Sequence, residues 1–455
     1  MSDFSKNRVG HDGVASTPTT YQVGYLKVYA NGIEHDGEGD ATEYDITNLL
    51  AYFEINESLN SSALEVILAI GDSVNITETL NLQGSERLEL LVHRKEPSGS
   101  RASERKSFTL KLRIAEIFNY VRAKPGLVTY NIRAVSDHVY INSLKKLRRS
   151  FHGSPTDLIR QICKSDLLIS KNDSDLEDAS SKNIIKGIYP NIRPMQSIAW
   201  LIKLAFDQGT PYFCYQTVNG SGSLRLKSYK QLLAEDPHDF KYKLVPFADT
   251  TVELETREGY LYEKGLIRDV TSEYGQSKLM SAMNGAYAST LHTIDISNKK
   301  YNKNLFNYNN SDMMKLNKNK SFAETENSDI SGLKLTDSID SKHYFVSLNE
   351  KSFGVNNGNY SSPAPIDLAK SMAHLEHLQY QTHKIQIAGN FDIKVGDKIQ
   401  IEIRKVHDNK KGAGIDKLQS GVYMITEINH RFKDGFYQDL IIQKDLSEVD
   451  LDATK

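Results

Sequence analysis

The sequence predicts a mainly β protein with mixed α/β insertions. Two regions of short segments in which apolar and polar residues alternate, one near the start of the chain and one at its end, predict antiparallel sheets. A region with helical periodicity lies between them. The chain has 455 residues, which at roughly 150 residues per domain is enough for about three domains.

The first β region is expected to follow a short tail. Residues 1–20 lack apolar periodicity and are expected to form a flexible N-terminal tail. From residue 21 to 141, many short alternating segments predict one β domain. In Phe108–Ile114 every second residue is apolar, as expected of a half-buried strand. Turn sequences such as Asn31-Gly32 and Pro125-Gly126 separate the strands.

Residues 142–250 are expected to form a mixed α/β domain. Ser154 followed by Pro155 predicts the start of a helix, because serine caps a first turn and proline fits its first position. A second helix is expected from Pro194 to Phe206, because apolar residues recur there at intervals of three and four residues. Gly209 is expected to end this helix. Alternating segments at 212–218 and 224–229, joined by a turn, predict a β-hairpin.

The second β region is expected to contain an insertion. Strand-like character at 251–296 and a dense series of strands within 379–446 predict one domain. Between them, residues 297–378 begin with an asparagine-rich stretch, expected to be irregular or exposed, and end in a helix with Leu368 and Leu378 on its apolar stripe. Asp434-Gly435 predicts the last hairpin, and residues 447–455 are expected to form a C-terminal tail.

Composition and charge exclude several classes of protein. With 56 basic and 58 acidic residues, the net charge of -2 gives no overall field for binding nucleic acid or anionic lipid. The longest apolar run, Leu64–Ile70, is interrupted by Glu65, so no membrane insertion is expected. Cys163 and Cys214 provide neither a disulfide framework nor a zinc site, and synthesis in a reducing cytoplasm is expected.

Sequence motifs for phosphate or dinucleotide binding are absent. The segments Gly220–Gly222 and Gly412–Gly414 lack the further glycine and the strand-to-helix context of a nucleotide-binding loop, and they predict turns. No G-x-S-x-G nucleophile elbow occurs, although a Ser, a His and an Asp brought together by the fold stay an open alternative. Asp397 and Glu402 are interpreted as surface charge.

Three histidines are the sharpest candidates for a metal site. One helix face would present His374 and His377 to a cation, with His383 further on, but the spacing differs from the zincin HExxH motif. We interpret them as the polar flank of the helix. The basic cluster Lys145–Arg149 could contact phosphate or an acidic partner, and is interpreted as a solvated loop or an intersubunit rim. The sequence thus assigns no catalytic, cofactor-binding or metal-binding residue, and no cofactor.

Three C-terminal segments follow one another in a characteristic order. Ile387–Ile399 contains Gly389-Asn390-Phe391 and Gly396-Asp397, Gly421–His430 comes next, and the chain closes with Tyr437–Gln443. This order resembles the last tube-like domain of the central baseplate hub protein of contractile-tailed bacteriophages. The N-terminal β region and residues 154–229 are similar, in order, to that family's first tube-like domain and intervening α/β domain. Gly285–Thr290, leading into Asp295, looks like the entry to its inserted outer segment.

The resemblance implies a structural protein of the virion with no enzymatic activity. Hubs of this family are homotrimers in which two similar tube-like β-barrels per subunit imitate six copies of a tube subunit, so that a threefold spike can join a sixfold tube. The implied partners are two further copies of the chain, the central spike protein, tail-tube or tube-initiator proteins, and baseplate wedge proteins. The implied location is the centre of the tail baseplate, after assembly in the host cytoplasm.

Two further expectations accompany the resemblance. Phage DNA would pass through the lumen of the ring during ejection without specific binding, which a near-neutral net charge suits. The two β regions show no repeat of residues, so any duplication between them is expected to be structural.

Three alternatives stay open at this level. The resemblance does not separate a phage tail from a related contractile injection device. A receptor- or glycan-binding tail adhesin would use the tyrosine- and asparagine-rich stretch 297–360 as a binding loop. A metal-dependent hydrolase of the cell envelope would use His374 and His377.

Overall fold

The computed structural model describes most of the chain between residues 17 and 445. The described residues are 17–30, 42–98, 102–170, 174–176, 179–181, 183–218, 223–244, 257–273, 278–296, 299–308, 311, 313–314, 316, 329–330, 333–334, 336, 338–348, 365–405, 414–416 and 419–445. Within them, one sheet of 13 strands and four smaller sheets are formed. This confirms the mainly β fold class with α/β insertions. Among these residues, no helix is long and apolar enough to cross a membrane.

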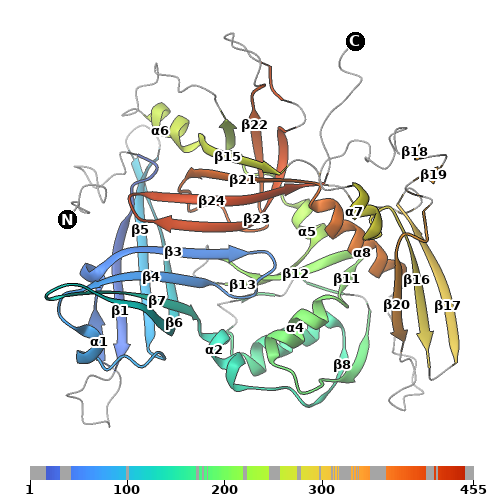
Figure 1. Cartoon of the computed structure of the whole chain (residues 1–455), viewed down its shortest axis with the longest axis horizontal. Helices are drawn as coiled ribbons and strands as arrows, with labels where there is room; N and C mark the ends of the chain where they lie inside the picture. Colours follow the sequence, from blue (N-terminus) through green and yellow to red (C-terminus); the bar gives the residue numbers. More distant parts are fainter. Residues whose placement is uncertain are drawn as a thin grey trace.

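The N-terminal part of the large sheet, called the first barrel from here on, curls around one apolar core (Figure 1). Its strands lie in the spatial order β3-β4-β7-β6-β5-β1-β2. Their bounds are β1 (Gln22–Ala30), β2 (Thr42–Asp45), β3 (Leu50–Ser58), β4 (Glu65–Asp72), β5 (Arg87–Ser98), β6 (Ala102–Lys124) and β7 (Leu127–Ser136), with a short 3-10 turn at Thr47–Leu49 and the helix α1 (Ile76–Thr79). Leu26, Leu68 and Leu110 are fully buried because they lie on the inward side of alternating strands.

The C-terminal part of the large sheet closes into a second barrel. Its spatial order is β15-β21-β24-β23-β22-β14. The bounds are β14 (Lys241–Leu244), β15 (Ile267–Glu273), β21 (Gln381–Ala388), β22 (Lys398–Ile403), β23 (Gly421–Phe432) and β24 (Phe436–Lys444), and the helix α6 (Arg257–Lys264) precedes β15. A bridge between Lys243 and Leu266 brings the two ends together. β14 lies in residues that the sequence assigned to the α/β domain, because its backbone pairs with β22.

The two curled sheets follow the same plan. Counted along the chain without the edge strand β2, each has the spatial order 2-3-6-5-4-1. Their irregularities also coincide: a bulge follows Leu50 in β3 and Ile267 in β15, and another follows Ile114 in β6 and Ile425 in β23. One pairing differs in direction, since β1 is antiparallel to β5 whereas β14 is parallel to β22. The chain therefore contains one sheet plan twice, a structural duplication.

A short match of residues accompanies this duplication. When the sheets are aligned on their bulges, Ile114–Ile117 of β6 corresponds to Ile425–Ile428 of β23, and both segments read Ile-x-Glu-Ile. Three identical residues do not make a repeat of the sequence, so the duplication is one of sheet order and pairing.

The middle region folds around a third core of mixed helices and strands. Its elements are α2 (Asp137–Leu144), β8 (Ser150–Gly153), α3 (Pro155–Gln161), a π-helical turn (Ile162–Asp166), β9 (Ser174–Asp175), β10 (Ile185–Ile188), α4 (Pro194–Ile202), β11 (Phe206–Asp207), β12 (Thr210–Gln216), β13 (Leu224–Ser228) and α5 (Tyr229–Ala234). The Ser154 hydroxyl caps α3 by accepting from the Asp157 N–H, as the sequence predicts. The expected end of α4 at Phe206 is wrong, because Phe206 pairs with Pro211 in β11 and β12.

A small outer sheet packs on a helix at one side of the molecule (Figure 1). The remaining elements are α7 (Lys278–Met283), β16 (Ala288–Asp295), β17 (Lys300–Asn307), β18 (Asp329–Ile330), β19 (Leu333–Lys334), β20 (His343–Leu348) and α8 (Pro365–Leu378). β16 pairs with β17 and β20, so it does not join the second barrel as residues 251–296 were expected to do. The described part of the asparagine-rich stretch 297–360 includes β17, β18, β19 and β20, so it is more regular than expected.

Candidate functional site at the seam between the two sheets

The two curled sheets are joined edge to edge. β23 pairs antiparallel with β3, with Glu427 opposite Ser58 and Phe432 opposite Phe53, and the two strands lie side by side in Figure 1. β23 also contributes to both apolar cores, since Ile428 packs in the second core and Phe432 in the first. Through this seam the backbone ladder holds the two copies of the sheet plan in a fixed relation.

Aromatic rings fill one side of the seam. The Phe432 ring stacks between those of Phe53 and Phe436, with 4.3 Å between ring centroids on either side. Tyr21 contacts Phe432 edge-on at 5.1 Å, and Phe391 lies 5.0 Å from Phe436. Phe53, Phe432 and Phe436 are no more than 1% exposed. Their burial contributes roughly 2 kcal/mol or more for each ring, so the seam is a substantial part of the fold's stability.

A buried carboxylate lies next to this aromatic stack. Glu57, which is 2% exposed, accepts a hydrogen bond of 2.7 Å from the Val218 N–H and lies 3.1 Å from Nε2 of His430. Because a carboxylate oxygen only accepts, Nε2 carries the hydrogen, and Nδ1 of the same ring accepts from the Gln438 amide at 3.1 Å. Gln438 also bonds to the backbone N–H and carbonyl of Asn390. The network links β3, β23, β24 and the end of β12.

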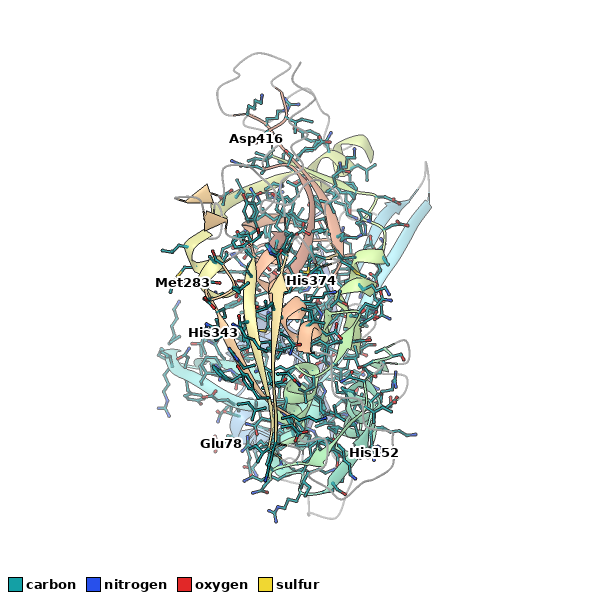
Figure 2. All side chains as sticks on the ribbon, turned by 90° about the vertical axis from the view of Figure 1, so that its right-hand side faces the viewer. Glu78, His152, Met283, His343, His374 and Asp416 are labelled. Carbon is teal, nitrogen blue, oxygen red and sulfur yellow. The ribbon has the colours of Figure 1, made fainter. Side chains whose placement is uncertain are left out.

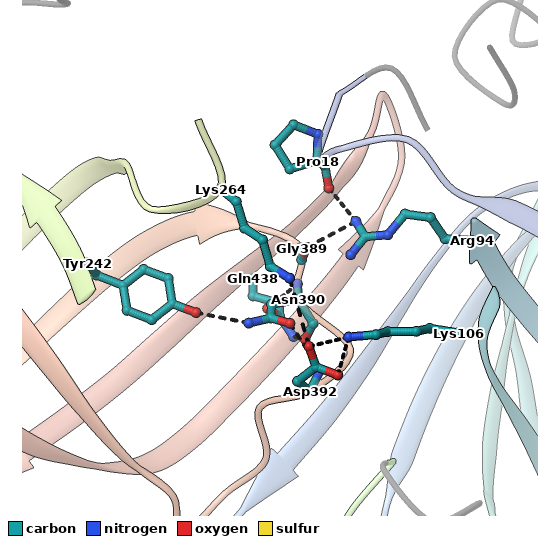
Figure 3. A network of polar contacts seen from close by, with 9 residues as sticks. All are labelled: Pro18, Arg94, Lys106, Tyr242, Lys264, Gly389, Asn390, Asp392 and Gln438. Atoms are coloured by element: carbon teal, nitrogen blue, oxygen red, sulfur yellow. Dashed lines mark hydrogen bonds and ion pairs between the residues drawn. The ribbon is translucent and has the colours of Figure 1, made fainter. Parts of the chain in front are cut away.

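A second polar cluster surrounds the loop after β21 (Figure 3). Arg94 of β5 donates through Nη1 to the Gly389 carbonyl at 3.0 Å and also to the Pro18 carbonyl. The Asp392 carboxylate accepts from Lys106 of β6 at 2.6 Å, and Nζ of Lys264 lies 3.8 Å from it. Figure 3 shows the side chains of Arg94 from β5, Lys106 from β6 and Lys264 from α6 converging on one loop. The loop thus ties the C-terminal barrel to the N-terminal sheet by a second route.

The three histidines that the sequence marks as candidates for a metal site make contacts within the protein. His374 on α8, labelled in Figure 2, packs against the Tyr229 ring at 5.5 Å. Nε2 of His377 lies 3.1 Å from the Ala286 carbonyl oxygen, and Nε2 of His383 lies 2.8 Å from the Tyr423 hydroxyl. In the part of the chain that the structure describes, no three His, Cys, Asp or Glu side chains are placed to hold a metal ion.

Two of these histidines make stability depend on pH. Burial, followed by the charges of His377 and Lys370, lowers the pKa of His374 to about 3, and burial with the nearby Lys444 lowers the pKa of His383 to about 4. Unfolded histidines titrate near 6.5, so at pH 6 to 4 the unfolded chain binds protons that the folded chain does not. The contribution of the two neutral histidines to the free energy of unfolding is therefore fully present above pH 6.5. It is lost as the pH falls toward their lowered pKa values.

We expect the free energy of unfolding to fall by about 1.4 kcal/mol per histidine for each pH unit between about 6 and 4. Urea unfolding followed by circular dichroism at several pH values measures this slope. The His374→Gln variant should have a shallower slope than the native chain, whatever its stability at pH 7. An unchanged slope in that variant would contradict the burial of a neutral imidazole at this position.

The basic cluster Lys145–Arg149 is largely paired within the middle region. Lys145 donates to the Asp166 carbonyl and Arg149 to the Asp166 carboxylate, both at 2.8 Å, while Arg148 donates to the Asn191 side chain at 2.7 Å. Leu147 is buried. The cluster is thus less available to an outside partner than a solvated loop would be.

Two acidic residues differ in their surroundings. Glu402 lies 3.6 Å from Nζ of Lys243, on a partly exposed strand. Asp397 is buried, where it accepts from the Lys394 N–H, and burial raises its pKa, so its interpretation as surface charge is wrong. The turns expected at Gly220–Gly222 and at Gly412 lie outside the described residues.

The chain has the fold of phage tail proteins. The 43 kDa tail protein of prophage MuSo2 from Shewanella oneidensis is 9% identical, with a TM-score of 0.50 over 92% of this chain and 98% of that one. A tail protein from Neisseria meningitidis is 10% identical, with a TM-score of 0.49 over 92% and 97%. The E. coli c3393 protein, a component of the type VI secretion system, is 7% identical, with a TM-score of 0.42 over 87% and 73%. No protein-family model and no curated protein sequence matches the chain.

Proposed function

We propose that this protein is the structural hub of a phage tail baseplate, a homotrimeric ring that joins the tail tube to the central spike. The observation that carries the proposal is the duplicated sheet plan, with its two copies joined through β23 and β3. Three chains would then present six equivalent positions around one axis, so that one face of the ring fits a sixfold tube while the chain itself keeps threefold symmetry.

The seam supports this role because it fixes the relative orientation of the two copies of the sheet plan within one chain. Continuous backbone pairing from β15 to β2 leaves little freedom between the barrels, since rotating one against the other would break the β23 and β3 ladder and expose the stacked rings. An adaptor with a hinge at this place would not hold six positions on one circle. Catalysis has no part in the proposal, and spike, tube and wedge proteins are its partners by fold-level analogy.

The mass of the purified full-length chain in solution tests the proposal. We expect light scattering to report three times the chain mass at micromolar concentration, and negative-stain images to show a ring. A heterologous interface that closes after three copies gives a defined species. A monomer at every concentration tested, or a dimer, would contradict the trimeric hub.

A further inference from the structure

Two long strand edges have no partner among the described residues. β6 pairs with β5 only as far as Arg113, and beyond that point its ladder runs to β7 alone. β15 pairs with β21 along one edge, and its other edge bears only the single bridge at Leu266. Residues 119–124 and Thr271 are exposed, including the apolar side chains Tyr120 at 50% and Val121 at 55%. Open edges of this kind are normally covered or paired.

In the duplicated strand order, these two open edges correspond to the two strands that pair at the seam. By the shared bulges, the end of β6 corresponds to the end of β23, and β15 corresponds to β3. β22 also pairs with β23 only up to Met424, one residue before the bulge, which matches the end of the β5 ladder at Arg113. In the second barrel, the part of β23 freed in this way pairs with β3. In the first barrel, the corresponding part of β6 is free.

We propose that the open edge of β6 (Glu116–Lys124) in one copy pairs antiparallel with the open edge of β15 (Ile267–Glu273) in the next copy, in the register of the internal seam. This inference rests on the proposed trimer and names the strands that close it. Within the described residues of one chain the two edges do not meet, since β6 pairs only with β5 and β7, and β15 pairs with β21 apart from the bridge at Leu266. A second copy is the partner that carries the complementary edge.

The register follows from the seam. Arg431 lies opposite Glu54 and Phe432 opposite Phe53, and these positions correspond to Val121 and Arg122 in β6 and to Thr271 and Val270 in β15. Val121 is therefore placed opposite Thr271 of the next copy, and Arg122 opposite Val270.

The side chains on the two edges suit this register. A further irregularity at Ala123 places Lys124 level with Asp269, so that opposite charges meet at the end of the ladder. Pairing would also cover part of the exposed Val121 side chain. In this segment β6 has one residue more than β23. The extra residue is accommodated in a bulge between Phe118 and Val121, where Asn119 has a left-handed φ of 54°.

A cysteine pair tests the register directly. We would introduce Val121→Cys and Thr271→Cys together, because directly opposed residues have Cβ atoms about 5 Å apart, within reach of a disulfide. The native Cys163 and Cys214 are buried at 1% and 4% exposure and do not compete. The matched control is Val121→Cys with Asp269→Cys, which moves one partner two residues along the same face to a diagonal distance of about 7 Å.

After mild oxidation, we expect the first pair to give a covalent trimer on a non-reducing gel, with dimers as intermediates, in at least tenfold greater yield than the control pair. Either single variant should give no trimer. A trimer by light scattering that fails to cross-link, or that cross-links equally in both pairs, overturns the proposed edge and leaves the hub proposal standing. A chain that stays monomeric and does not cross-link overturns both.

Discussion

Replacing Gly389 with alanine is expected to lower the free energy of unfolding by about 3 kcal/mol or more. A Cβ at this position would lie 1.9 Å from Cδ1 of Phe436, far inside van der Waals contact. The ring cannot move aside, because it is fully buried and stacks on Phe432 at 4.3 Å. The backbone cannot move either, since the Gly389 N–H donates to the Phe436 carbonyl at 2.9 Å. Urea unfolding followed by circular dichroism measures the loss.

Gly71→Ala is the matched control. Gly71 lies in β4 at the position that corresponds to Ala388 of β21, and a Cβ there would meet one atom only, the Leu49 carbonyl oxygen at 4.0 Å. We expect its stability to change by less than about 1 kcal/mol, and the alanine lowers the entropy of the unfolded chain. If Gly389→Ala proved as stable as Gly71→Ala, the close packing of the loop on Phe436 would be wrong.

The strands and helix caps could be predicted because their signals are local. The alternation in Phe108–Ile114 specifies one buried face, and the Ser154 cap needs only the N–H of Asp157 three residues on. The outer strands β17 and β20 gave no such signal. Their outward residues include Tyr301 and Phe345, which are 58% and 70% exposed, so the pattern lacks the polar face that normally marks a surface strand.

The seam could not be predicted because its partners are distant in the chain. Glu57 and His430 are 373 residues apart, and the local sequence around one of them does not predict the other as its partner. One signal was present: Glu57 follows Phe53 and Ile55 on the inward face of β3, where alternation calls for an apolar residue. A carboxylate at such a position predicts a buried polar partner, but its identity depends on which strand pairs with β3.

The residues alone do not show the duplication of the sheet plan, for a related reason. A sheet position requires a side chain of suitable size and polarity, so equivalent positions need not share residues. Leu68 of β4 corresponds to Ile385 of β21, and both are buried, yet the residues differ. Apart from the short Ile-x-Glu-Ile match, the two copies share their strand order and the location of their bulges, which only the strand pairing reveals.

Replacing Glu57 with alanine is expected to cost about 3 to 5 kcal/mol. The change leaves three buried donors, the N–H groups of Val218 and Val395 and Nε2 of His430, without their acceptor, at about 1 to 3 kcal/mol for each well-made bond. Glu54→Ala is the control on the same strand. Glu54 lies on the opposite face, partly exposed, and Arg431 faces it across the seam, so its loss should cost less than about 1 kcal/mol.

Removing both partners should cost less than the two single changes combined. In Glu57→Ala with His430→Ala, the imidazole no longer lacks an acceptor, so the penalties overlap by about 1 kcal/mol or more. The loss of unfolding free energy in the double variant is compared with the sum of the losses in the two single variants, each measured against the native chain. This comparison separates the Glu57 and His430 pair from the aromatic stack beside it, which all three variants keep. Strict additivity, or a Glu57→Ala loss equal to that of Glu54→Ala, would mean that Phe53, Phe432 and Phe436 hold the seam without the buried network.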